Sequence, residues 1–133
     1  MSATVYAKNS ILDLCFGSIA YTPPASYWLG LSSTTIYAAG SGATEPSGYG
    51  YARVEMPNDK STFSYSSSGC VLNSGSISFP LTTGSWGTMT YAGLWSGSTG
   101  GSVLYFLALS PSVVVQNATV VNISACQLAI SIT

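Results

Sequence analysis

The carboxylates are the side chains in this sequence that most resemble acid–base catalysts, and there are 4 of them in 133 residues. Glu55 and Asp59 flank a turn and could lie close together, whereas Asp13 and Glu45 lie farther toward the N-terminus. Hydrolysis of a glycoside needs two carboxyl groups facing each other across a cleft. Charged residues at a strand end and in a turn are more often solvated surface groups. We therefore rank a carbohydrate-active enzyme last and expect no catalysis.

Other residue types that carry catalytic or metal chemistry are scarce. The sequence contains no His, which is the commonest general base and the commonest metal ligand. Cys15, Cys70 and Cys126 lie far apart along the chain and form no Cys-x-x-Cys pair. We expect them to be reduced, buried thiols that pack as small hydrophobic groups. We expect neither a metal nor a cofactor.

Tyrosine is the abundant side chain that can bind a ligand, because its amphipathic ring loses little entropy on contact. The sequence has 9 Tyr residues. A strand over 49–56 would carry Tyr49, Tyr51, Arg53 and Glu55 on one face. These four residues are the candidate contact face for a ligand or a second subunit. Cross-strand packing that is partly exposed to water explains the same pattern, and both interpretations stay open.

Charged residues make up only 5% of the sequence, and all of them precede residue 61. A total of 3 basic residues cannot form the surface that a nucleic-acid-binding protein needs. The longest apolar run, Val103–Leu109, is too short to cross a bilayer, and no clear signal-peptide core precedes it. We therefore expect folding in a cytoplasm without membrane association. Uncharged strand edges pair readily with other chains, so residues 61–133 predict a homo-oligomer unless a Ser- and Thr-rich surface keeps the monomer soluble.

The N-terminal segment has the apolar spacing of a helix, and the rest of the chain has the spacing of short strands. Ala7, Ile11, Leu14 and Cys15 fall on one face of a helix over about 5–16, which we expect to pack on a sheet. Gly17 is placed to end this helix. Turns rich in Gly, Ser and Pro separate the predicted strands, which are 27–32, 49–56, 63–65, 70–72, 77–79, 86–95, 102–109, 113–115, 119–124 and 128–132.

Short strands with regular turns predict a mainly β fold, which is an antiparallel β-sandwich or a jelly-roll-like barrel with one short N-terminal helix. Neither an internal repeat nor a linker interrupts the pattern, so residues 1–133 are predicted to form a single β-sandwich domain. Ser102–Leu109 is apolar on both faces, which predicts a central strand covered on both sides. Ser110-Pro111 is predicted to be a turn.

Several segments, taken in their order along nearly the whole chain, resemble a family of small structural proteins of tailed-bacteriophage virions. The charge-free second half departs from this family, whose strands commonly carry some Asp or Lys. The resemblance rests on Asn9–Asp13, Phe16-Gly17, Ala20–Ala25, Trp28–Ser32, Glu45–Arg53, Asn73–Gly75, Ile77–Pro80, Trp86–Tyr91 and Ser98–Gly101.

The resemblance implies a non-enzymatic virion component that is assembled in the cytoplasm of a host bacterium. Because the chain has neither a coiled coil nor a collagen-like tract to project it, we favour a protein that binds other coat subunits. The leading interpretation is a capsid decoration, or cement, protein. It would be a homotrimer that binds the major capsid protein or other virion subunits and stabilises the head shell. The alternative is a tail-fibre or tail-tip protein that contacts a host surface glycan or receptor through its tyrosine-rich face.

Overall fold

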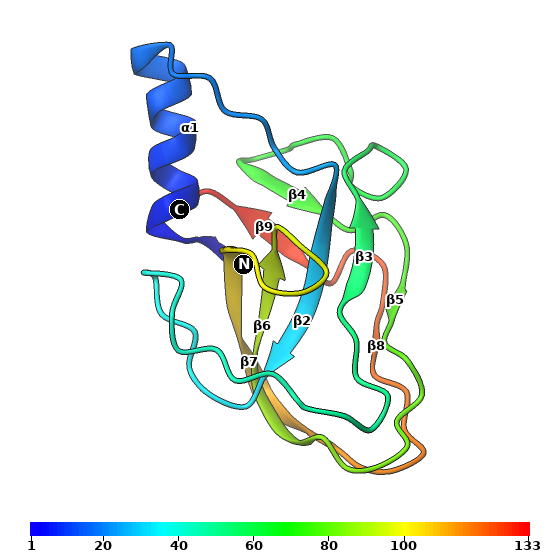
Figure 1. Ribbon diagram of the computed structural model, residues 1–133. Coiled ribbons are helices and arrows are strands. Elements are labelled where there is room, and N and C mark those ends of the chain that lie inside the picture. Colours follow the sequence, from blue (N-terminus) through cyan, green and yellow to red (C-terminus); the bar gives the residue numbers. More distant parts are fainter.

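The structure is a computed structural model that describes residues 1–133, and its strands form two facing layers (Figure 1). The larger layer is a five-stranded antiparallel sheet in the order β1 (Ser2–Ala3), β7 (Val103–Val115), β6 (Gly87–Trp95), β2 (Ser26–Ser32) and β3 (Val54–Pro57). The second layer has two short antiparallel pairs, β4 (Cys70–Leu72) with β9 (Ala129–Ser131) and β5 (Ile77–Ser78) with β8 (Asn122–Ile123). A mainly β antiparallel sandwich with one helix is the predicted fold class, which is therefore confirmed.

The main hydrophobic core lies between these two layers. Leu29, Leu31 and Leu94 point inward from the large sheet, and each is at most 2% exposed. Phe63 and Phe79 close the core from the opposite side. Alternate residues of an antiparallel strand face opposite sides, so each strand of the large sheet supplies every second side chain to this core.

The other face of the large sheet is covered by an irregular segment of the chain, residues 33–53. Ile36 from this segment packs with Trp95 and Val103 in a second buried cluster. The segment connects β2 to β3 and is rich in Gly, Ser and Thr. Polar loop residues thus cover a sheet face that a helix covers in many other folds.

Several predictions about the strands need correction. Residues 63–65 form no strand, and Phe63 makes only an isolated bridge with Asn73. The strand predicted over 49–56 is regular only at β3, because Gly48, Tyr49 and Gly50 all have positive φ and break the alternation. The predicted turn at Ser110-Pro111 lies inside β7, which continues to Val115 beside β6. Of the predicted central strand 102–109, Val103 and Leu104 are buried and Tyr105–Leu107 are half-buried, whereas β7 is exposed from Ser110 to Val114.

The helix α1 spans Val5–Gly17, close to the predicted range, and projects from the sandwich (Figure 1). Thr4 begins it, with its backbone N–H donating to the carbonyl of Leu104 (2.9 Å) and its Oγ accepting from the N–H of Ala7 (3.4 Å). Gly17 is the last helical residue, and Ser18 takes the left-handed conformation that closes the end (φ 54°).

The expectation that α1 packs its apolar stripe on a sheet is wrong for most of its length. Ala7 is 2% exposed, but Leu14 is 45% exposed and Cys15 is also exposed. The sheet offers α1 only the short strand β1 and one end of β7, so the later turns have no strand beneath them. The prediction of buried thiols is wrong too, because Cys126 is exposed as well. The helix is not long and apolar enough to traverse a bilayer.

Candidate functional site

The four residues of the candidate contact face do not lie together on one exposed surface. Tyr49 is 58% exposed, and its backbone carbonyl accepts a hydrogen bond from Nε1 of Trp86 (3.0 Å). Tyr51 turns inward and is half-buried, and the side chain of Arg53 is almost fully buried. Glu55 is exposed and accepts a hydrogen bond from the hydroxyl of Ser26 (2.7 Å). Contact of these residues with a partner stays a prediction. The structure does not place them on one face of a strand, so they could not form the contact together in that way.

Arg53 and Glu45 form a bidentate ion pair, which was not predicted from the sequence. Nε of Arg53 donates to Oε1 of Glu45 (2.9 Å), and Nη2 donates to Oε2 (2.7 Å). Nη1 donates to the carbonyls of Gly97 (2.6 Å) and Gly100 (2.8 Å) in the loop between β6 and β7. The guanidinium lies 4.4 Å from the ring centre of Trp95. One side chain thus ties two loops to the sheet, and we call this group the Arg53 clamp.

Tyr51 extends the Arg53 clamp to the edge of β2. Its hydroxyl donates to Oε1 of Glu45 (2.7 Å) and accepts from the backbone N–H of Leu31 (3.0 Å), where β3 no longer pairs with β2. The hydroxyl thereby satisfies a strand N–H that would otherwise lack a partner. Gly30 leaves the necessary space, since a Cβ there would lie 2.9 Å from the Tyr51 oxygen.

The electrostatics of the Arg53 clamp are those of a structural support. Burial acts to raise the pKa of Glu45, but hydrogen bonds from Arg53 and Tyr51 and the nearby positive charge outweigh it, and the pKa lies below its usual range. Burial and the hydrogen bond to Glu45 raise the pKa of Tyr51. Glu45 is therefore held ionised and Tyr51 protonated, which keeps all their hydrogen bonds in place.

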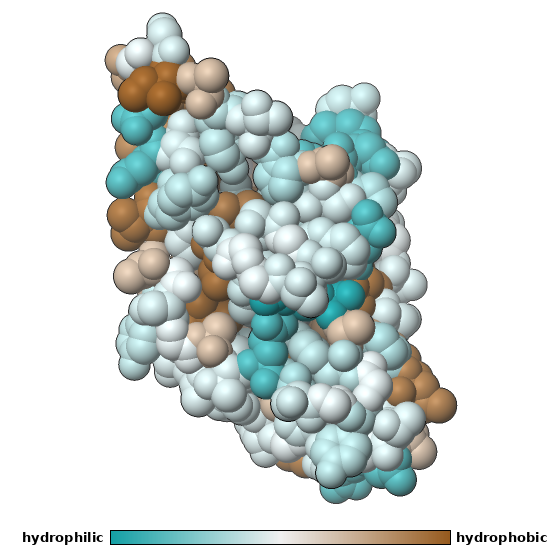
Figure 2. Space-filling model, viewed as in Figure 1, coloured by the Kyte–Doolittle hydropathy of each residue, from teal (hydrophilic) through white to brown (hydrophobic).

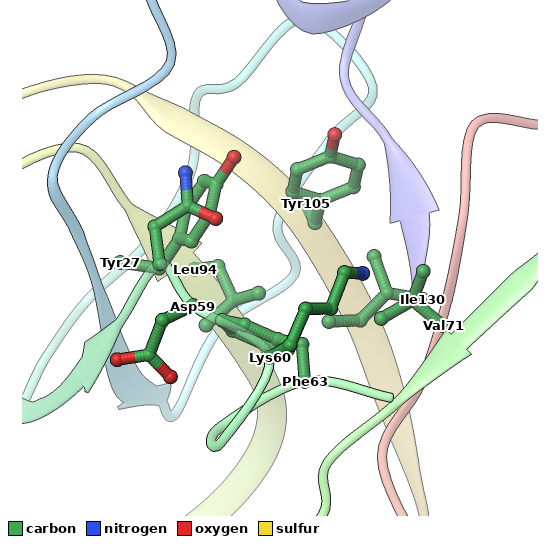
Figure 3. Close-up of a pocket in the computed structure, with 9 residues that line it drawn as sticks. Tyr27, Asp59, Lys60, Phe63, Val71, Leu94, Tyr105 and Ile130 are labelled. Atoms are coloured by element: carbon green, nitrogen blue, oxygen red, sulfur yellow. The ribbon is translucent and has the colours of Figure 1, made fainter. Parts of the chain in front are cut away.

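A different part of the molecule holds an open cavity of about 270 Å³ (Figure 3). It lies between the large sheet and the β4–β9 pair. The ring of Tyr27 stands edge-on to Phe63 (centroids 5.8 Å apart) and to Tyr105 (6.2 Å). We call it the aromatic cavity; its walls come from Tyr27, Phe63, Val71, Leu94, Tyr105 and Ile130, and its rim from Asn58, Asp59 and Lys60.

The hydroxyls of Tyr27 and Tyr105 are the polar groups that the walls of the aromatic cavity offer. Both rings direct their oxygens toward the same side in Figure 3, and no hydrogen bond within the protein contributes to the electrostatics of either hydroxyl. Burial raises the pKa of both phenols, with a further contribution from neighbouring tyrosines that include Tyr21. Both groups therefore stay protonated and can donate to a ligand as well as accept from it.

The charged residues at the rim are already engaged. Oδ1 of Asp59 accepts from the N–H groups of Ser61 (2.9 Å) and Thr62 (2.9 Å), so this carboxylate caps a turn and points away from the rings in Figure 3. The hydroxyl of Ser61 also donates to Oδ1 (2.6 Å), and this bond, with those from the N–H groups, lowers the pKa of Asp59. Nζ of Lys60 donates to the carbonyl of Ser64 (3.0 Å) and lies 5.2 Å from the ring centre of Tyr65. The cavity therefore presents apolar walls, two neutral hydroxyls and the ammonium of Lys60 to a ligand.

Sequence reasoning missed both the Arg53 clamp and the aromatic cavity. Opposite charges at Glu45 and Arg53, on either side of a glycine-rich turn, were a signal for the clamp. The cavity has no comparable signal, because its lining comes from five strands and a loop that are spread along the chain. No group of three or more His, Cys, Asp or Glu side chains assembles at either place or elsewhere in the structure.

Together the fold and the site define a small antiparallel β-sandwich with an aromatic cavity between its layers and a projecting helix beside it. The family model described as podophage GP4 fiber I protein gp80 matches residues 2–131. Because the match spans nearly the whole sequence, the chain belongs to this family of phage fibre proteins and is a structural component of a virion. The resemblance to phage structural proteins is thereby confirmed. No curated protein matches the sequence.

Proposed function

We propose that the chain is a non-enzymatic subunit of a phage tail fibre that contacts the surface of the host cell. The observation that carries this proposal is the match of residues 2–131 to a fibre protein family. The capsid-decoration interpretation relied on the lack of any segment that would project the domain. The match to a fibre protein family is a more direct argument, and it favours the fibre over the head.

The aromatic cavity is the part of this chain that best fits a sugar on the host surface. The apolar C–H face of a sugar ring packs against aromatic rings, and its hydroxyls need neutral donors and acceptors nearby. Tyr27, Phe63 and Tyr105 offer three rings, and the two tyrosines add free hydroxyls. A cavity of about 270 Å³ has room for one such ring and stays open for the rest of a polysaccharide.

The positions of the carboxylates support a binding role without catalysis. Glu45 is locked in the Arg53 clamp, Asp59 caps a turn, and Glu55 accepts a hydrogen bond from Ser26. A glycosidase needs a proton donor and a second carboxylate on opposite sides of its substrate. Within the aromatic cavity the structure places one carboxylate, Asp59, and its hydrogen bonds hold its charge at the rim.

Antibody labelling of intact particles, combined with assays of particles that lack the protein, tests the location. We expect gold at the tail, loss of adsorption to host cells, and unchanged resistance of the head to heat. Gold on the head, together with heat-sensitive particles that still adsorb, would overturn the fibre proposal and restore the capsid-decoration interpretation.

The sugar-binding role is tested with the Tyr27→Phe/Tyr105→Phe double variant, which removes two hydroxyls and leaves the rings. The probe is polysaccharide extracted from the host cell surface, with binding measured by calorimetry. We expect about a tenfold or greater loss of affinity, as for two lost hydrogen bonds. Tyr65→Phe is the matched control, since Tyr65 is 79% exposed and lies outside the cavity lining. Equal affinity of the double variant and the wild type would contradict the assignment of the cavity.

A further inference from the structure

The side of α1 that faces away from the sandwich is apolar and uncovered. Val5 is 49% exposed, Leu12 53% and Phe16 87%. At 3.6 residues per turn these three fall in one narrow stripe, and Ala7, which is 2% exposed, lies on the opposite side of the helix. Figure 2 shows hydrophobic atoms at the free end of the helix and along its outer edge. A helix with apolar residues on both sides is normally covered on both sides.

The spacing of the outer stripe is that of a coiled-coil seam. In a seven-residue repeat labelled a to g, Val5 and Leu12 take position d, and Asn9 and Phe16 take position a. Ala7 then falls at position f, the position farthest from a seam, and it is the residue that packs on the sandwich. The contact with the sandwich therefore leaves the whole seam free.

The two charged residues of α1 fall on the two flanks of this seam. Lys8 takes position g and Asp13 takes position e of the following repeat. Residues five apart on one helix are not neighbours, so these two do not pair within α1. In parallel helices, however, position g of one helix lies beside the next position e of its neighbour. A buried Asn at position a also favours a single register.

We infer that α1 is a self-association surface: the helices of two or more copies of this chain pack in parallel along the seam of Val5, Asn9, Leu12 and Phe16. Lys8 of one copy then pairs with Asp13 of the next. Such an arrangement is cyclic and places each sandwich on the outside, because the sandwich is attached at the side of α1 that carries Ala7.

The helix is held in place before any such contact forms. Thr4 caps its N-terminus and donates from Oγ to the carbonyl of Val103 (2.9 Å). The N–H of Val5 donates to the carbonyl of Ala38 (2.8 Å). A free helix of this length is marginal in water, but this one is already ordered by its own sandwich. Association therefore does not have to supply the free energy of forming the helix, and a short seam suffices.

The free edge of β7 is the competing surface on the same molecule. β1 covers only Tyr105 and Phe106 of this edge, and Val114 is 60% exposed. An uncharged edge strand can pair with the edge of another copy. The experiment must therefore separate packing of α1 from pairing of β7.

The test measures the mass of the protein in solution by sedimentation, over a series of concentrations. The Leu12→Ser/Phe16→Ser variant is expected to raise the dissociation constant at least about tenfold, because it removes two large apolar contacts from the seam. Leu81→Ser is the matched control, since Leu81 is 59% exposed and lies far from α1 in the sequence. Val114→Lys places a charge on the β7 edge and is expected to leave the mass unchanged.

A charge exchange tests the parallel register. Lys8→Asp and Asp13→Lys are each expected to weaken association, and the double exchange Lys8→Asp/Asp13→Lys is expected to restore it. The inference is overturned if the wild type stays monomeric at every concentration, or if Leu12→Ser/Phe16→Ser associates as the wild type does. It is also overturned if Val114→Lys alone abolishes association, or if the double exchange is as weak as the single variants.

Discussion

The Arg53 clamp and the outer side of α1 differ in whether their side chains find partners within the chain. In the clamp, Arg53 and Glu45 satisfy each other and two loop carbonyls, and the Arg53 side chain is only 7% exposed. Along α1, Leu12 and Phe16 face solvent at 53% and 87% exposure. The Arg53 clamp thus completes its interactions within one chain, whereas α1 leaves apolar side chains exposed to solvent.

The largest difference is expected between two identical truncations, Leu94→Ala in the sandwich and Leu12→Ala on the helix. Leu94 is 1% exposed, so its truncation leaves a cavity and should lower the free energy of unfolding by about 3–5 kcal/mol. Leu12→Ala should cost less than about 0.5 kcal/mol at a dilution where the protein is monomeric. Urea denaturation followed by tryptophan fluorescence measures both. If both variants lost a similar amount of unfolding free energy, the proposed difference between the sandwich and the helix would be contradicted.

The Arg53 clamp is expected to give the next largest effect. Arg53→Met leaves Glu45, which is 23% exposed, without its counter-ion and frees the carbonyls of Gly97 and Gly100. We expect the free energy of unfolding to fall by about 3 kcal/mol. Lys60→Met is the matched control, because Lys60 is an exposed cation and its loss should change stability by less than about 0.5 kcal/mol. Equal effects would mean that the clamp is dispensable.

The smallest of the stability effects is a pH dependence that the clamp should impose. The pKa of Glu45 is lower in the folded protein than the unfolded value of about 4.3. Its contribution to stability is therefore complete above that value and is lost as the pH falls through the lower, folded pKa. Urea titrations between about pH 7 and pH 3 should show a shallower acid loss for Glu45→Gln than for the wild type.

Asp59 is the control for this pH dependence. Its pKa is also lowered, by hydrogen bonds to Ser61 and Thr62, but the carboxylate is fully exposed and water screens it. Asp59→Asn should therefore leave most of the acid dependence in place. If Asp59→Asn flattened the curve more than Glu45→Gln, the clamp would not be the main acid-sensitive interaction of the fold.

Much of the fold follows from local sequence patterns. β2 and β6 lie close to their predicted positions, because a short run of apolar and aromatic residues favours a strand. β3 is shorter than predicted because Gly48, Tyr49 and Gly50 have positive φ, and Tyr51 bonds to Leu31 of β2 through its side chain. A local alternation of residues does not reveal a contact between positions 20 residues apart.

The surfaces were harder to predict than the strands. The range of α1 follows from its sequence, but both of its sides are apolar, and only the sandwich decides which side is covered. The aromatic cavity depends on Tyr27 of β2 and Tyr105 of β7, which meet over β6 in the large sheet although their strands are far apart in the chain. Lys8 and Asp13 lie beside the exposed stripe of α1, but their placement has a meaning only once the structure shows which side of the helix is uncovered.

Cross-linking through an engineered cysteine at the seam tests most directly whether α1 is completed by other copies of the chain. Asn9→Cys is introduced with Cys15→Ser and Cys126→Ser, which remove the two exposed thiols. In a parallel seam, position 9 of one copy faces position 9 of the next, so mild oxidation should yield a covalent dimer. Leu14→Cys in the same background lies on the side of the helix nearer the sandwich and should remain monomeric. Failure of Asn9→Cys to cross-link at any concentration, or equal cross-linking of Leu14→Cys, would contradict the account.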